Sequence, residues 1–395
     1  MPKSPENRVR LNRRALLGAG GAAMFVAACD APAVISQLAG PQVGRRGPTT
    51  VALLTPGGGD DQGRRVIARG LENATRLAIR DLSGPEINLR VYQTGGDAGR
   101  AASQAAQAVN DGADIILGPL FGDSARAVGS TVAPRGINVL SFSNNPSVAG
   151  GNVFLLGPMF ENTAHRLLSY AADQGKGRVM IIAERNESGR IAEQAIRAAA
   201  VRTSANVVGS ADYEFSQRGI ISAMPQIADR ARSSGAQMIL MTAGSEGALP
   251  LLVEMLPQND VQPDTFQFAG LTRWDIPPAT LQLSGLQGGW FALPEPSLSR
   301  AFNSRYSASF GEDPHPTSVL AFDGMAAIGA LLNRGGDNPL SAASLRQGAG
   351  FIGGNSVFRF RSDTTNERGL AVAEVRDRQV SVLSPAPRRF PGAGA

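Results

Sequence analysis

From residue 49 onward, short runs of apolar residues alternate with longer segments in which apolar residues recur every three or four positions. The first pattern is typical of buried strands and the second of amphipathic helices. The pattern predicts strands at 50–54, 87–92, 114–117 and 137–142, and later at 178–182, 206–213, 237–242 and 265–269. It predicts helices at about 67–82, 98–110, 123–132, 190–203, 217–234 and 245–256.

A strand followed by a helix, repeated along the chain, predicts parallel sheets with helices on both faces and right-handed crossovers. Two such series, separated by the irregular stretch 144–159, predict an α/β fold with two similar lobes, each a doubly wound parallel sheet. We expect 49–160 and 285–333 to form lobe 1, and 161–284 and 334–384 to form lobe 2.

The last part of the chain departs from this alternation. A strand is expected at 288–293, a helix with Phe302, Tyr306 and Phe310 on one face, and an apolar helix at 319–332. Short alternating strands then follow, and they favour an antiparallel ribbon: 356–361, 370–375 and 379–383. We expect residues 385–395 to be a disordered tail.

The N-terminal residues have the layout of an export signal. Basic residues that include Arg13 and Arg14 precede a short apolar run, and Val26-Ala27-Ala28 precedes Cys29. The run is too short to span a membrane. The sequence before Cys29 resembles a bacterial lipobox, and Arg13-Arg14 resembles a twin-arginine signal. We therefore expect 1–28 to be removed, Cys29 to carry a lipid that anchors the protein to a membrane, and 29–48 to be a flexible tether.

Charge and cysteine content exclude several classes of function. Cys29 is the only cysteine in 395 residues, so no internal disulfide can form. The formal net charge is +5, but residues 1–28 carry five basic side chains and one acidic side chain. The remaining chain is therefore close to neutral, and its charge gives no reason to expect nucleic-acid binding.

No enzymatic or metal-binding motif stands out. Neither His165 nor His315 has a partner at metal-ligand spacing, and no Gly-x-Ser-x-Gly elbow precedes a helix. The glycines at 57–59 precede a helix, but Gln62 stands where a dinucleotide motif needs its third glycine. Asp60-Asp61 suits the start of a helix better than acid–base chemistry. We therefore expect a non-enzymatic protein without cofactor or metal.

Small and polar residues follow several of the predicted strands. Ligands of doubly wound sheets bind at the carboxyl ends of strands, so two lobes with such loops predict a ligand cleft between them. Gly, Ser and Asn are also common in ordinary turns, which is the alternative. The candidate cleft residues are Gly118, Pro119, Phe121, Gly122, Ser141, Ser143, Asn144, Ser188, Thr242, Gly244, Thr272, Arg273 and Trp274.

Residues 49–383 resemble the leucine/isoleucine/valine-binding branch of the periplasmic type I binding-protein superfamily. The resemblance rests on residues 51–54, 115–120, 139–144 and 322–323. Residues 118–120, 141–144, 156–158, 170–175 and 271–274 resemble more specifically the penicillin-binding-protein activator lipoproteins. In that group, the same fold is a lipid-anchored partner of peptidoglycan synthases.

The resemblance implies that Ser141 and Ser143 would hold a ligand carboxylate. Gly122 stands where the amino-acid receptors have a serine, and Ser188 stands where they have a tyrosine. The acidic residue that pairs with a ligand ammonium should fall near 272–273 and is missing there, and Arg273 would instead favour an anion or a protein carboxylate.

We therefore expect a lipid-anchored periplasmic activator of a class A penicillin-binding protein that regulates peptidoglycan synthesis. The alternative is a solute receptor that delivers branched-chain amino acids, or a related small polar ligand, to an ABC permease.

Overall fold

The computed structural model describes residues 47–390. The predicted signal, the lipidation site Cys29 and the tether up to residue 46 lie outside the described residues, as do residues 391–395.

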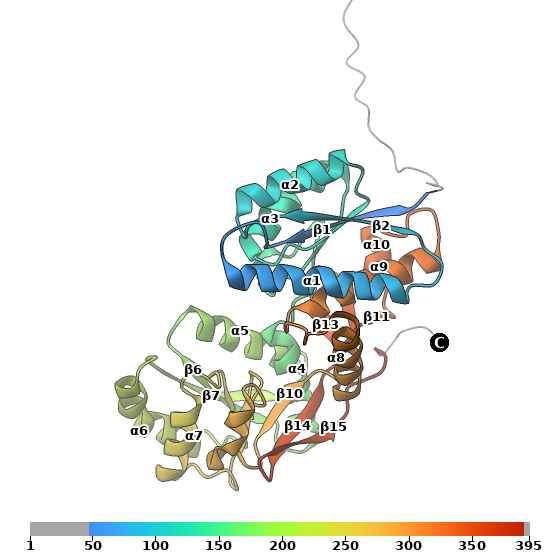
Figure 1. The fold of residues 1–395 in the computed structure, drawn as a ribbon. Coiled ribbons are helices and arrows are strands. Elements are labelled where there is room, and N and C mark those ends of the chain that lie inside the picture. The colour runs from blue at the N-terminus through green and yellow to red at the C-terminus, as the bar shows by residue number, and fades with distance from the viewer. Residues whose placement is uncertain (1–46, 391–395) are drawn as a thin grey trace, which may run out of the picture. The chain divides into compact units, whose positions relative to one another are not determined.

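The first lobe is a parallel sheet of five strands in the order β2-β1-β3-β4-β5 (Figure 1). These strands are β1 (Thr49–Thr55), β2 (Ile87–Gln93), β3 (Ile115–Leu117), β4 (Val139–Ser141) and β5 (Val153–Leu155). Helices α1 (Gln62–Asp81) and α9 (Ser318–Arg334) pack on one face, and α2 (Ala98–Asn110) and α3 (Gly122–Val132) pack on the other. Strand β5 lies in the stretch 144–159 that the pattern left irregular, because no α-helix separates it from β4 and the alternation of strand and helix fails there.

The second lobe is a mixed sheet of seven strands in the order β15-β14-β10-β9-β8-β6-β7. Five strands run parallel: β6 (Arg178–Glu184), β7 (Asn206–Tyr213), β8 (Met238–Met241), β9 (Gln267–Gly270) and β10 (Trp290–Leu293). β14 (Ala371–Arg376) pairs antiparallel with β10, and β15 (Gln379–Ser384) pairs antiparallel with β14 at the edge of the sheet. Helices α4 (Phe160–Asp173) and α5 (Glu187–Val201) cover one face, and α6 (Gln217–Ser233) and α7 (Leu249–Gln258) cover the other.

The predicted fold class, two lobes with helices on both faces of each sheet, is therefore confirmed, with an antiparallel edge added to the second sheet. Helix α7 begins at Leu249, four residues after the predicted start at 245. The shorter elements are α8 (Pro296–Phe310), α10 (Ala342–Leu345) and the 3₁₀ turns Ala133–Arg135, Pro146–Val148, Pro278–Gln282 and Ser284–Leu286.

The C-terminal third contacts both cores. A small antiparallel sheet contains β11 (Phe351–Ile352), β12 (Val357–Phe360) and β13 (Asn366–Arg368). Phe358 and Phe360 pack in the core of the first lobe, whereas β14 and β15 belong to the second sheet. The segment 334–384, which the sequence assigned to lobe 2, is thus divided between the two lobes, because its apolar side chains fill both cores.

The chain end also departs from the expectation of disorder from residue 385. Phe390 is only 4% exposed, and the guanidinium carbon of Arg359 lies 4.6 Å from the centre of its ring. Ala386 is also buried, in the core of the second lobe, so the described residues beyond 384 are held at two buried side chains.

A buried ion pair joins the C-terminal segment to the first lobe. The Arg368 guanidinium lies 2.8 Å from a carboxylate oxygen of Asp323 on α9 and donates to the carbonyl oxygen of Leu156 at 2.6 Å. Burial raises the pKa of the Asp323 carboxyl, and both Arg368 and the Gly354 N–H oppose this shift. The Arg368 side chain is 4% exposed and that of Asp323 is fully buried, so the pair fixes β13 against α9 and the end of β5.

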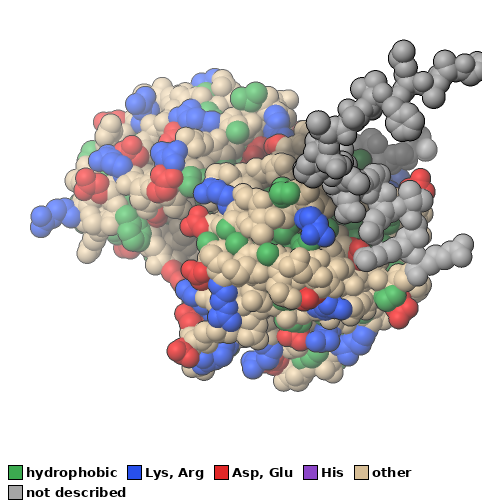
Figure 2. Space-filling view, turned by 90° about the horizontal axis from the view of Figure 1, so that it is seen from above, with side chains coloured by type: hydrophobic (Ala, Val, Ile, Leu, Met, Phe, Trp, Pro, Cys, Tyr) green, Lys and Arg blue, Asp and Glu red, His purple; other side chains and the backbone are tan. Residues whose placement is uncertain are grey.

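On the face shown in Figure 2, basic and acidic side chains are interspersed, and neither sign dominates. None of the helices in residues 47–390 combines the length and the apolar character that a membrane span requires.

Candidate functional site

The candidate site lies where the parallel strands end. The strand order reverses between β1 and β3 in the first sheet and between β6 and β8 in the second. Ligands of open parallel sheets bind beside the carboxyl ends of strands at such reversals. The predicted cleft residues should therefore lie in the loops after these strands and in the loops beside them.

Gly118 follows β3 and lies against the neighbouring strand end. Its φ of +94° falls in the region that favours glycine, and a Cβ here would lie 2.3 Å from the carbonyl oxygen of Leu54. Gly118 and Pro119 are both buried. Their role in this structure is close packing of two strand ends, and neither presents a surface to a ligand.

Ser141 and Ser143 are also occupied within their own loop. The Ser141 hydroxyl donates to the carbonyl oxygen of Pro119 at 2.9 Å and accepts from the Ser143 N–H at 3.2 Å. The Ser143 hydroxyl accepts from the Asn145 N–H at 3.1 Å. Ser141 is fully buried and Ser143 is 4% exposed. The hydroxyl groups that the resemblance assigned to a ligand carboxylate therefore hold the loop together.

Phe121 and Asn144 are the exposed members of the predicted first-lobe set. Phe121 is 38% exposed, and the Arg64 guanidinium carbon lies 5.7 Å from the centre of its ring. Gly122 begins α3, and a Cβ there would lie 3.3 Å from the side chain of Asn145. The loop is therefore close-packed at the position where a receptor serine was expected.

Three arginines at the same rim were missed by sequence reasoning. Arg64, Arg65 and Arg100 donate to carbonyl oxygens in the loops after β1 and β2, at 2.6, 2.8 and 2.9 Å. All three are exposed. Their position in the first turns of α1 and α2, just after glycine-rich loops, was the available signal.

Two threonines predicted for the second lobe bond to backbone. The Thr242 hydroxyl accepts from the Glu184 N–H at 3.3 Å, and the Thr272 hydroxyl donates to the carbonyl oxygen of Ala243 at 3.0 Å. Gly244 differs, because a Cβ at this position would meet nothing within 4 Å. Open space therefore remains beside the end of β8.

Ser188 lies exposed in the first turn of α5. The cap of this helix is Asn186, whose side-chain oxygen accepts from the Gly189 N–H at 2.8 Å. Ser188 thus has no part in the cap.

Trp274 is a core residue of the second lobe. It is fully buried in the cluster that contains Phe291, and a Cβ at Gly270 would lie 2.2 Å from the indole nitrogen. Gly270 therefore makes room for the indole. Trp274 is therefore not in the cleft, where the sequence placed it. Burial of its large ring in the core removes more apolar surface from water than a place in the cleft would.

An acidic residue is present in this loop, two positions beyond the expected place. Asp275 accepts from the Arg273 Nε at 2.7 Å, and a second contact joins Nη2 to the other carboxylate oxygen. The Asp275 side chain is 14% exposed. A guanidinium that grips a carboxylate through two hydrogen bonds largely neutralises it, so this acid is not available to a ligand ammonium while the pair is closed.

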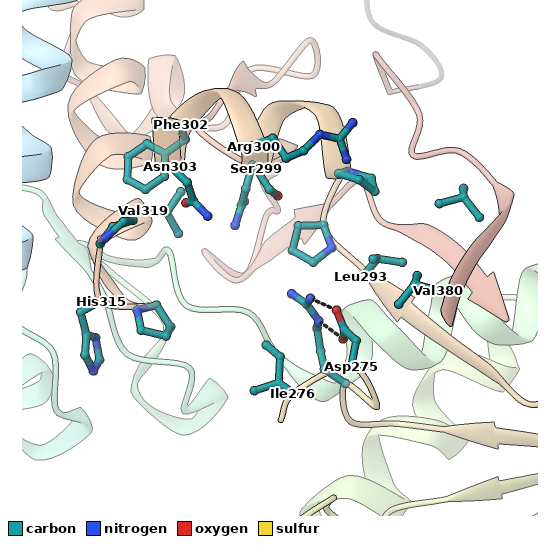
Figure 3. Close-up of a pocket in the computed structure, with 17 residues that line it drawn as sticks. Asp275, Ile276, Leu293, Ser299, Arg300, Phe302, Asn303, His315, Val319 and Val380 are labelled. Carbon is teal, nitrogen blue, oxygen red and sulfur yellow. Dashed lines mark hydrogen bonds and ion pairs between the residues drawn. The ribbon is translucent and has the colours of Figure 1, made fainter. Parts of the chain in front are cut away.

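Arg273 and Asp275 lie at the edge of a cavity of about 510 Å³ (Figure 3). The cavity is bounded by the loop after β9, the end of β10, helix α8, the loop before α9, and β15. Its walls are mainly apolar, with a few polar side chains from α8. The apolar residues include Ile276, Leu293, Pro294, Pro296, Phe302, Pro314, Pro316, Val319, Val380 and Val382, and the polar residues include Ser299, Arg300, Asn303, His315 and Asn355.

His315 is one of the polar groups of this cavity. Its Nδ1 accepts from the Thr317 N–H at 3.2 Å and lies 2.8 Å from the Thr317 hydroxyl. Burial lowers the pKa of the imidazole. Within residues 47–390, no group of three or more His, Cys, Asp or Glu side chains is placed to hold a metal ion.

Of the thirteen predicted cleft residues, only Arg273 lines this cavity. Sequence reasoning looked at the strand ends and missed α8 and the loop before α9. Prolines at 294, 296, 314 and 316, which flank both segments, were a visible sign of rigid, close-packed backbone there.

Comparisons with known proteins agree with the fold. The sequence profile of the family described as "Periplasmic binding protein" matches residues 48–379. The chain belongs to the periplasmic binding protein family. Among curated protein sequences, none matches this chain.

Three solved structures show the likeness of fold. One is a putative branched-chain amino acid ABC transporter protein from Rhodospirillum rubrum, with 18% identity, a TM-score of 0.71, and coverage of 85% of this chain and 100% of that one. Another is an ABC transporter substrate-binding protein from Desulfitobacterium hafniense in complex with Leu, with 17% identity, a TM-score of 0.60, and coverage of 85% and 100%.

The third is the solute-binding protein of an ABC transporter from Rhodopseudomonas palustris BisB5, in complex with 3,4-dihydroxybenzoic acid. It is 12% identical, with a TM-score of 0.56 and coverage of 88% of this chain and 98% of that one. At these identities the likeness shows the two-lobed fold alone.

Proposed function

We propose that this protein is a non-enzymatic solute-binding protein of a periplasmic ABC importer, and that its ligand is a small carboxylate with an apolar body. The observation that carries the proposal is the cavity bounded by Arg273, Ile276, Leu293 and helix α8. Its volume of about 510 Å³ lies within the range of small-molecule sites, roughly 300–1,000 Å³.

The chemistry of the walls selects the ligand. Apolar side chains line most of the cavity, so a hydrocarbon or aromatic body would be held by burial of its apolar surface. Arg300 is exposed at the edge, and among the described residues no carboxylate lies within ion-pair distance of it. A guanidinium in this position suits a ligand carboxylate, with Ser299 and Asn303 as neighbouring hydrogen-bond groups (Figure 3).

The comparisons are in keeping with this chemistry. One neighbour was solved with Leu and another with 3,4-dihydroxybenzoic acid. Both molecules combine a carboxylate with an apolar body. We expect the ligand of this chain to come from the same chemical range, a branched-chain amino acid or an aromatic acid.

The test is a thermal-shift and calorimetric screen with leucine, isoleucine, valine and dihydroxybenzoic acid. A ligand at a hundred times its Kd should stabilise the folded state by about 2.7 kcal/mol. Ser299→Phe on α8 fills the cavity and should abolish the shift. Ser304→Phe is the matched control, because Ser304 is exposed on the same helix and does not line the cavity. A ligand that shifts both variants equally would contradict this site.

A penicillin-binding-protein activator is the second candidate. The observation that favours it is that the hydroxyls of Ser141, Ser143 and Thr242 bond to backbone groups. In an amino-acid receptor we would expect these hydroxyls to face the ligand. Pull-down of a class A penicillin-binding protein, together with no thermal shift from any screened ligand, would favour the activator over the importer receptor.

We further propose that the protein is lipid-anchored at Cys29 after export. The support is the lipobox-like sequence before Cys29 and the absence of any other cysteine. Cys29→Ser should move the protein from the membrane fraction to the soluble fraction of cells. A variant that still sediments with membranes would refute the anchor.

A further inference from the structure

A second hollow lies where α4 meets the small sheet of β12 and β13. It measures about 860 Å³, and arginines from four separate segments line it. We call it the arginine groove. Its basic residues are Arg166 on α4, Arg202 after α5, Arg346 after α10, Arg359 and Arg361 at β12, and Arg368 on β13.

The arginine groove carries more positive than negative charge. The buried Asp323 neutralises Arg368 from beneath. Five other guanidiniums then line the groove, and Glu161 and Glu367 are the acidic residues among its lining. The local balance is about +3, whereas the chain beyond residue 28 is close to neutral as a whole.

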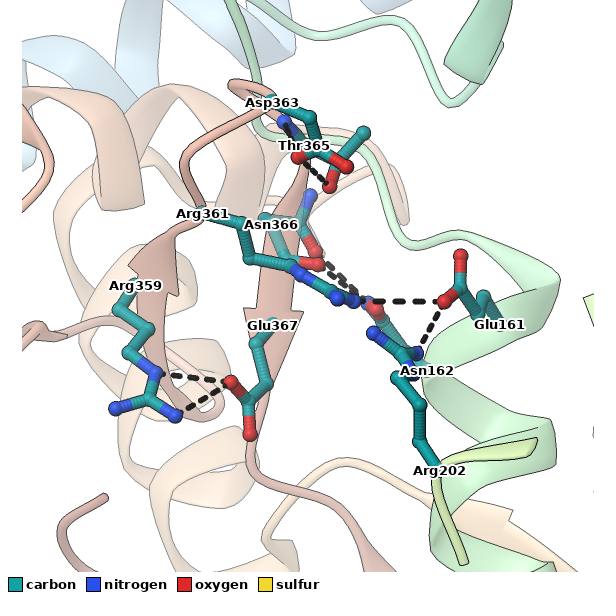
Figure 4. A network of polar contacts seen from close by, with 9 residues as sticks. All are labelled: Glu161, Asn162, Arg202, Arg359, Arg361, Asp363, Thr365, Asn366 and Glu367. Carbon is teal, nitrogen blue, oxygen red and sulfur yellow. Dashed lines mark hydrogen bonds and ion pairs between the residues drawn. The ribbon is translucent and has the colours of Figure 1, made fainter. Parts of the chain in front are cut away.

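Glu161 is shared between two arginines (Figure 4). It forms an ion pair with Arg202, and its Oε1 lies 3.4 Å from Arg361 Nη1. Both contacts fall on Oε1, so neither guanidinium holds Glu161 through two parallel hydrogen bonds, and N–H groups of both remain for another acceptor.

Arg359 shows the geometry that the groove offers to a carboxylate. Its Nε lies 2.8 Å from a carboxylate oxygen of Glu367, and its guanidinium stacks on Phe390. The pair is partly exposed, with 25% of the Arg359 side chain accessible. A partly exposed pair contributes little to stability, so its carboxylate can be exchanged for that of a partner at low cost.

Arg166 has carbonyl and hydroxyl acceptors. Its Nε donates to the carbonyl oxygen of Leu370 at 2.6 Å, and Nη2 donates to the Ser384 hydroxyl at 2.6 Å. Burial lowers the pKa of its guanidinium. Within residues 47–390, no carboxylate lies within ion-pair distance of it, so a nearby negative charge would be favourable.

We propose that the arginine groove docks an acidic segment of a partner protein, with side-chain carboxylates bound by Arg202, Arg346 and Arg361. The groove is hollow, and its floor includes the buried residues Phe360 and Asn366. A peptide can enter such a hollow, whereas a flat membrane surface would meet only its rim. This inference does not depend on the cavity beside α8.

The test measures binding of a fluorescein-labelled decaglutamate peptide to the full chain by fluorescence anisotropy at low salt. We expect saturable binding that weakens as salt rises, because exposed charge pairs are screened. Arg346→Ala and Arg202→Gln should each weaken binding by about threefold, and the double variant by about tenfold.

Arg65→Ala is the matched control, because Arg65 is exposed and donates only to nearby backbone carbonyls, as Arg346 does. It should leave the peptide affinity unchanged, and circular dichroism should show that all variants are folded. No saturable binding of the peptide, or equal losses in Arg65→Ala and Arg346→Ala, would overturn the proposal. Binding to phosphatidylglycerol vesicles that falls in the same variants, without peptide binding, would also overturn it.

Discussion

The loops at the strand ends and the arginine groove use polar side chains in opposite ways. In the loops, the hydroxyls of Ser141, Ser143 and Thr242 each bond to a backbone group, and both serines are almost completely buried. In the groove, guanidiniums outnumber carboxylates and the ion pairs are partly exposed. The first arrangement holds the lobe together, and the second leaves hydrogen-bonding capacity for a partner.

The difference teaches that residue type alone does not identify a binding site. A serine or threonine after a strand is equally suited to a ligand and to its own loop. The number of acceptors within reach of its hydroxyl decides between these roles, and that number depends on tertiary structure.

Breaking the buried ion pair of Arg368 and Asp323 should cause the largest loss of stability. Asp323→Asn leaves a guanidinium without its counter-charge in a site closed to solvent, and such losses cost about 3–5 kcal/mol of unfolding free energy. Urea denaturation followed by circular dichroism measures the loss. The matched change is Glu367→Gln in the arginine groove, which breaks a partly exposed pair and should cost about 0–1 kcal/mol. Equal losses would show that the two pairs do not differ as proposed.

Ser141→Ala should cause the second-largest loss of stability. The change removes an acceptor for the Ser143 N–H and a donor to the carbonyl oxygen of Pro119, both in a buried loop. Unsatisfied buried groups of this kind cost about 1–3 kcal/mol. We expect lower stability in urea with no change in the Kd of any ligand found for the cavity beside α8. A change in Kd without a change in stability would indicate that Ser141 contacts the ligand after all.

Glu161→Gln tests whether the arginine groove has hydrogen-bonding capacity for a partner. It releases Arg202 and Arg361 from their shared carboxylate and should tighten decaglutamate binding by about threefold. Glu193→Gln on α5 is the control, because it breaks an i,i+4 pair with Arg197 outside the groove. Fluorescence anisotropy at low salt compares the two, and an equal gain in both would indicate a general effect of net charge.

Most of the fold could be predicted from the sequence because parallel strands and their helices leave strong periods in the chain. Strand β5 was missed although β3 and β4 are equally short, because no α-helix separates it from β4 and the alternation of strand and helix fails there. The strands β14 and β15 were predicted, but the pairing of β14 with β10 was not, because pairing across more than seventy residues has no local signal.

The candidate site was predicted less well, and the reason is geometric. Trp274 follows a strand, as a ligand residue would, yet Gly270 and Gly289 leave room for its ring inside the lobe. Both glycines were visible in the sequence, but nothing local shows that they lie beside the indole. Arg166, Arg202 and Arg361 come from three segments that only the folded chain brings together.

Substitution of His315 should have the smallest effect on stability. It tests the cavity beside α8 without altering the strand-end loops or the arginine groove. Burial lowers the pKa of His315 in the folded state, so the unfolded chain binds a proton more readily. The stability from the neutral imidazole is complete above the ordinary histidine pKa of about 6.5 and is lost as pH falls below it. The unfolding free energy should therefore decline between about pH 7 and 5, and that of His315→Gln should decline less over this window.

Because Nδ1 of His315 accepts from the Thr317 N–H, protonation also breaks that bond at the wall of the cavity. Calorimetry with a bound ligand at pH 7 and at pH 5 should thus show a pH dependence in the parent that the variant lacks. An identical profile in both proteins would remove His315 from the cavity's chemistry.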